Sequence, residues 1–142
     1  MLIAPLILAS CHAYRPILIP YTIGHQGAAA MQEMKRNDLT LHRKLSFARI
    51  ICCSSSAELN NKGVDLSLEG KFPEAIALFN KARETDANEG ALYNNLGIIL
   101  DLTGKKSEAF DMYSKACIID PGNAIFRNNF LTFVDFRTRA EK

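Results

Sequence analysis

From about residue 56 onward, apolar and small residues recur every three to four positions, which is the spacing of one face of an α-helix. Leu59, Gly63 and Leu66 keep this spacing, and the pattern stops at Gly70. It resumes in the next stretch, at Ala75, Leu78, Phe79 and Ala82. A glycine can end a helix and reverse the chain without steric cost. The pattern therefore predicts a hairpin of two helices.

The same pattern returns after 34 residues. When residues 57–90 are laid over residues 91–124 without a gap, 13 of the 34 positions are identical. A third copy begins near Ile125, where Asn128 and Asn129 again keep the spacing, and it ends with Lys142. Fixed periods of this length are typical of arrays in which each unit buries its apolar face against the next. We therefore expect an all-α protein, a short α-solenoid of about two and a half helical hairpins.

The second copy resembles a tetratricopeptide repeat (TPR). Its sequence carries an aromatic-Asn-Asn-Leu-Gly run, small residues in the second helix and a closing proline, at Tyr93 to Gly97, Ala109, Tyr113, Ala116 and Pro121. Residues 56–89 match more loosely, with Leu59 in place of the aromatic residue. The resemblance covers about 56–136. It implies a right-handed superhelix with repeats 56–89 and 90–123 and a partial repeat 124–142, whose helix caps the TPR domain 56–142.

Residues 1–55 show no repeat, and we interpret them as a leader or tail. Residues 1–56 hold six basic and two acidic residues, a net charge of +4. One interpretation is a largely disordered tail or a mis-assigned start. A second is lipid anchoring or export, because the sequences ending at Cys11 and at Cys53 each resemble the site at which bacterial lipoproteins are lipidated. A third is an extra helix over 38–51 that packs on the first repeat. Cytoplasmic and membrane-anchored locations both stay open.

The sequence carries no pattern of an enzyme or of a metal site. Phosphate-binding glycine loops, a Gly-x-Ser-x-Gly turn and a His-Glu-x-x-His pair are all absent from it. The four cysteines form no Cys-x-x-Cys pair. Basic residues are few and are not interleaved with aromatic ones, which argues against nucleic-acid binding. We therefore expect a non-enzymatic protein without cofactor or metal.

In the TPR family the first helices of successive hairpins line a concave groove that receives a peptide or a partner helix. Carried over by position, the resemblance assigns eleven residues to this groove: Asn60, Asn61, Val64, Leu68, Asn94, Asn95, Ile98, Leu102, Asn128, Asn129 and Phe136. An asparagine amide both donates and accepts, so a row of asparagines can bind the backbone of a peptide whatever its side chains. The alternative is that these asparagines form only local hydrogen bonds.

The last predicted helix is unusually aromatic. Phe126, Phe130 and Phe133 are spaced four and three residues apart and predict a stripe that faces the place of a missing helix, while Leu131 and Val134 pack inward. Such a stripe is a candidate interface for a second copy or for a partner helix. The sequence thus predicts a small adaptor or scaffold that binds another protein. The alternative is an assembly subunit that forms homo-oligomers through this helix, with a membrane contact only through an N-terminal anchor.

Overall fold

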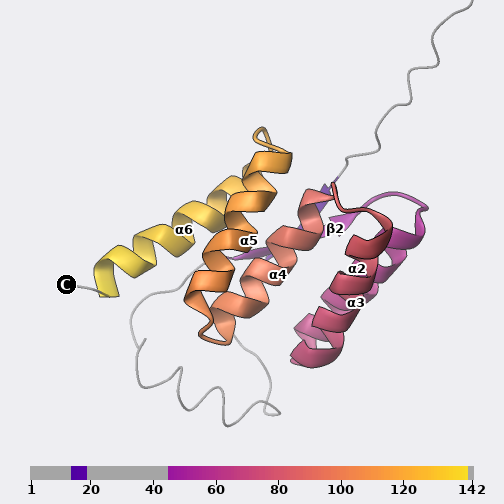
Figure 1. Cartoon of the computed structure of the whole chain (residues 1–142), viewed down its shortest axis with the longest axis horizontal. Helices are drawn as coiled ribbons and strands as arrows, with labels where there is room; N and C mark the ends of the chain where they lie inside the picture. The colour runs from indigo at the N-terminus through magenta and orange to yellow at the C-terminus, as the bar shows by residue number, and fades with distance from the viewer. Residues whose placement is uncertain (1–13, 19–44, 141–142) are drawn as a thin grey trace, which may run out of the picture.

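The computed structural model describes residues 14–18 and 45–140. This part of the chain forms five helices and two short strands (Figure 1). The elements are β1 (Tyr14–Leu18), β2 (Ser46–Ile50), α2 (Ser55–Leu68), α3 (Phe72–Thr85), α4 (Gly90–Leu102), α5 (Lys106–Ile119) and α6 (Ala124–Ala140). The prediction of a predominantly helical protein is confirmed. The two strands were not predicted.

The turns between paired helices are built alike. Gly70 ends the turn after α2 with φ 77°, and Gly104 ends the turn after α4 with φ 83°. The residue after each glycine donates its N–H to the carbonyl five residues back, Lys71 to Leu66 at 2.9 Å and Lys105 to Leu100 at 2.8 Å. This left-handed backbone conformation suits glycine because a Cβ would be strained there. The predicted helix reversals at these two glycines are confirmed.

Each helix pair packs closely through small residues. A Cβ added to Gly63 of α2 would lie 2.6 Å from the ring of Phe79 on α3, and one added to Gly97 of α4 would lie 2.9 Å from the ring of Tyr113 on α5. Both rings are fully buried. In Figure 1 the helices follow one another from α2 and α3 at the magenta end to α6 at the yellow end.

Strand β2 lies against α2, α4 and α6, the three helices that follow one another at about the repeat spacing. Its other neighbour is β1, which pairs with it in antiparallel orientation. The expectation of a helix over 38–51 is therefore wrong for residues 46–50, which are extended, while residues 38–44 lie outside the described part. The segment Leu45–Ile50 packs in the same unit as the helices, upstream of the boundary expected at residues 55 and 56.

Candidate functional site

The strand β2 is held by asparagine side chains from three successive helices. Each of three asparagines forms a two-way hydrogen bond with the backbone of one strand residue, accepting from its N–H and donating to its C=O. The pairs are Asn61 with Ile50 at 3.0 and 2.9 Å, Asn95 with Ala48 at 2.8 and 2.9 Å, and Asn129 with Ser46 at 2.9 and 2.8 Å. Asparagines 34 residues apart thus bind strand residues two apart. We call these three side chains the asparagine ladder.

The spacing of the ladder matches the geometry of an extended chain. In a strand, backbone groups on one edge belong to every second residue, so two residues advance about 7 Å. One repeat of this chain therefore advances along β2 by the same distance as two strand residues. The bonds read only N–H and C=O groups, which every residue except proline offers. This arrangement binds an extended backbone largely without regard to its sequence.

A second pair of asparagines completes the hydrogen bonding. Asn60 donates to the carbonyl of Ala48 at 3.0 Å, and Asn94 donates to the carbonyl of Ser46 at 3.2 Å. The amides also bond to one another in an unbroken series from Asn129 through Asn94, Asn95 and Asn60 to Asn61, with distances of 2.7 to 3.1 Å. Four of these five side chains are buried. The buried polar groups are satisfied by one another and by the strand, as burial requires.

The side chains of the strand segment are buried on both faces of β2. Leu45 and Phe47 join the core made by the helix pairs, whereas Ala48 and Ile50 join a second apolar cluster around Phe126. At the other end, Arg49 forms an ion pair with Asp65 of α2. Buried apolar side chains and paired backbone groups together place β2 in one register.

The remaining predicted groove residues fall into three groups. Val64 and Ile98 are fully buried in the core, so they support the groove from below. Leu68 is exposed, while Leu102 and Phe136 are partly buried beyond the strand. Asn128 departs from its repeat equivalents, because its side chain is exposed and takes no part in the asparagine network. Its carbonyl instead accepts from Thr132 Oγ1 at 2.7 Å, within α6.

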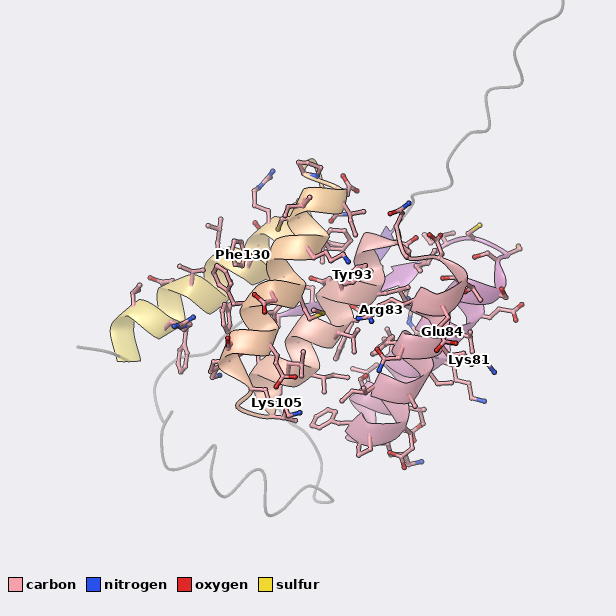
Figure 2. The ribbon with its side chains drawn as sticks, viewed as in Figure 1. Lys81, Arg83, Glu84, Tyr93, Lys105 and Phe130 are labelled. Atoms are coloured by element: carbon pink, nitrogen blue, oxygen red, sulfur yellow. The ribbon has the colours of Figure 1, made fainter. Side chains whose placement is uncertain are left out.

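The predicted phenylalanine stripe is not an exposed face. Phe126 and Phe133 are fully buried inside the chain, where Phe126 packs over Gly90 and Phe133 packs 5.3 Å from Tyr113, measured between ring centroids. Phe130 is partly buried against Phe110 of α5, at 5.4 Å (Figure 2). The expectation was wrong because α6 turns this face towards α4 and α5. Leu131, which we expected inside, is exposed instead.

Tyr93 of α4 is the centre of a group of cations. The side chains of Arg83 and Lys115 lie 5.3 and 4.5 Å from its ring centroid, and its hydroxyl donates to the carbonyl of Ala87 at 3.0 Å. Figure 2 shows Arg83 reaching from α3 towards Tyr93. Cations attract the face of an aromatic ring. This contact therefore joins α3, α4 and α5 and serves the packing of one helix pair on the next.

The cysteines give no catalytic or metal centre in the described residues. Cys52 and Cys53 form an exposed adjacent pair between β2 and α2, while Cys11 lies outside the described part. Lipidation at Cys11 or Cys53 stays a prediction. Burial raises the pKa of the partly buried Cys117 thiol, and the charge of Arg127 opposes this. Among the described residues, no three His, Cys, Asp or Glu side chains group together to hold a metal, and no helix is long and apolar enough to cross a membrane.

Comparison of the chain with protein-family models, with curated proteins and with solved structures finds no match. The argument for function therefore rests on the geometry of the asparagine ladder.

Our sequence reasoning missed the residues that occupy the groove. A signal was present, because Leu45, Phe47 and the residues up to Ile50 alternate with Ser46 and Arg49 in the two-residue period of a strand. We had interpreted the end of this stretch as the apolar part of a lipidation signal. Only six residues carry the alternation, and short apolar runs of this kind do not distinguish a strand from a helix segment.

Proposed function

We propose that this chain is a non-enzymatic protein-interaction module built from tetratricopeptide-type repeats, in which the asparagine ladder binds an extended polypeptide segment through its backbone. The repeat part of the proposal is supported by the two alike turns at Gly70 and Gly104. It is supported further by the equivalent close contacts of Gly63 with Phe79 and of Gly97 with Tyr113. In such arrays each unit leans on its neighbours and leaves a concave surface for binding.

One observation carries the binding part of the proposal. Asn61, Asn95 and Asn129 each form two hydrogen bonds with one residue of an extended strand, and these three residues occupy one position of the repeat. Recognition of an extended segment by backbone hydrogen bonds, with pockets for alternate side chains, is a general mode of peptide binding. Buried apolar surroundings of Phe47 and Ile50 would supply the preference for apolar side chains.

The groove is filled by the chain itself. β2 is tied to α2 by residues 51–54 alone, and a tether this short gives the attached segment an effective concentration in the millimolar range, as an order of magnitude. A free peptide of the same sequence at micromolar concentration therefore does not displace β2. A partner gains access when the hold on β2 is weakened.

Phe47→Ala weakens this hold selectively. Truncation of a buried phenylalanine costs about 3–5 kcal/mol. At 1.4 kcal/mol for each factor of ten, this is roughly a 10²- to 10³-fold loss or slightly more. The effective concentration of the tethered strand falls accordingly, to the micromolar range as an order of magnitude. A free peptide that still carries Phe47 then competes at micromolar concentration.

The test uses the full chain and a fluorescent peptide of residues 44–51. We expect the peptide to bind the Phe47→Ala chain at tens of micromolar or below, as an order of magnitude, and to leave the wild-type chain unbound. A peptide that itself carries Phe47→Ala is the matched control and binds neither chain. Adding Asn95→Ala to the Phe47→Ala chain weakens binding at least tenfold, because the central backbone bonds are lost.

Circular dichroism distinguishes loss of fold from loss of binding. If the Phe47→Ala chain is partly unfolded, addition of the wild-type peptide raises its helicity, because ligands that bind only the folded state stabilise it. A folded Phe47→Ala chain that ignores the peptide at 100-fold higher concentration than expected refutes the proposal. Equal binding with and without Asn95 refutes the role of the ladder.

A further inference from the structure

The strand β2 has two edges, and the asparagine ladder uses only one of them. Ser46, Ala48 and Ile50 point their N–H and C=O groups towards the helices. Because backbone groups alternate between the two edges of a strand, those of Phe47 and Arg49 point the other way. The helices therefore hold β2 as a fixed strand with an outer edge that can pair with a second strand.

In this structure β1 occupies the outer edge. The register places Ile17 opposite Phe47, Arg15 opposite Arg49 and Pro16 opposite Ala48. A proline cannot donate to a strand ladder, so it is tolerated only where no donor is needed. Opposite Ala48 no donor is needed, since the backbone groups of Ala48 are bonded to Asn95 and Asn60. The ladder on one edge thus explains why a proline fits in the middle of the strand on the other.

The two strands are held very differently. β2 packs on α2, α4 and α6, whereas the main contact of β1 is β2 itself. β1 also lies far along the chain, since residues 19–45 separate it from β2. An isolated pair of short strands is at best marginally stable in water. β2 is therefore part of the helical unit, and β1 is an added strand that a better-matched segment can replace.

We propose that the outer edge of β2 is a docking site for an extended segment of a partner protein, which adds antiparallel to β2 in place of β1. The partner segment needs an N–H at the residues opposite Phe47 and Arg49, and it accepts proline opposite Ala48. The site does not require β2 to leave the groove, so it goes beyond the binding proposed above. A second copy of this chain carries only the identical strand, which loses to the tethered one by effective concentration. The occupant is therefore a segment of a different protein.

The test frees the edge in the full chain and then scans proline through a probe. Arg15→Pro and Ile17→Pro together remove the two donors of β1 that face β2, while the helical unit is unchanged. The probe is a labelled synthetic peptide of residues 12–20. We expect it to bind this double variant, and a Pro16→Ala probe to bind within about threefold of it, because position 16 faces no free acceptor. An Ile17→Pro probe binds at least tenfold more weakly, because a donor is lost opposite Phe47.

Residue-resolved amide exchange identifies which edge the probe uses. Addition of the probe slows exchange at Phe47 and Arg49 and leaves Ser46, Ala48 and Ile50 protected. Faster exchange at these last three residues would mean that the probe displaces β2, and this overturns the edge site without touching the groove. Absence of binding, equal binding of all three probes, or concentration-dependent dimerisation of the wild-type chain by exchange of β1 overturns it as well. Loss of the groove with this exchange pattern intact would instead refute only the peptide-binding role of the ladder.

Discussion

Replacement of Asn95 with alanine removes the centre of the asparagine network. Asn95 is fully buried, and its amide joins the strand to both neighbouring repeats. Its Oδ1 accepts from the N–H of Ala48 at 2.8 Å and from Asn94 at 3.1 Å. Its Nδ2 donates to the carbonyl of Ala48 and to Asn60 Oδ1, both at 2.9 Å. The substitution deletes all four bonds at once.

The loss in stability follows from the groups left behind. The carbonyl of Ala48 still accepts from Asn60, and Asn94 still donates to Ser46. The N–H of Ala48 and Oδ1 of Asn60 lose the partners described above. Each orphaned buried group costs roughly 1–3 kcal/mol, so we expect a loss of about 4 kcal/mol in the free energy of unfolding. Domains of this kind have about 5–15 kcal/mol in total, so the effect is large.

Urea unfolding of the full chain, followed by circular dichroism, measures this loss. With a slope of about 1–2 kcal/mol per molar urea, 4 kcal/mol lowers the midpoint by about 2–4 M. Asn128→Ala is the matched control, because Asn128 occupies the repeat position of Asn60 and Asn94 but is exposed. It should change stability by no more than about 0.5 kcal/mol. If Asn95→Ala loses less than about 1 kcal/mol, or no more than Asn128→Ala, the ladder does not hold the strand as described.

Three further measurements test other parts of the fold. Gly63→Ala should destabilise the chain by about 1–3 kcal/mol in the same urea assay, because its Cβ would lie 2.6 Å from the buried ring of Phe79; an unchanged midpoint would show that the helices separate freely. Phe133→Ala should cost about 3–5 kcal/mol and Leu131→Ala under about 1, and the reverse order would restore the exposed stripe that the sequence predicted. Iodoacetamide at neutral pH should modify Cys117 more slowly than the adjacent cysteine pair before α2, because partial burial and a raised pKa keep its thiol covered and protonated; peptide mass mapping that finds equal rates would contradict this.

The candidate site could be found in part from the sequence. The 34-residue repeat identified the asparagines of the ladder, because identical residues at identical places of a repeated unit meet the same kind of neighbour. It could not separate Asn128 from Asn60 and Asn94. Only the orientation of α6 against the strand decides that Asn129 binds Ser46 while Asn128 faces solvent.

The last helix shows the same limit. Apolar residues lie on more than one side of α6, so the spacing alone allowed either Phe133 or Leu131 to point inward. Packing on α4 and α5 decides for Phe133, which meets Tyr113. A helix pattern specifies a face only when one side is clearly more apolar than the other.

By itself, the sequence determined the helices, their ends at Gly70 and Gly104 and the positions of the ladder. These features depend on residues within one or two turns of each other and on their repetition, which a chain displays directly. Only the tertiary structure decided that the groove holds the chain's own strand. The amide of Asn129 bonds to a residue 83 positions away, and the amide of Asn95 to one 47 positions away. Backbone N–H and C=O groups are common to nearly all residues, so no side-chain pattern in the sequence marks which six of them such amides will bind.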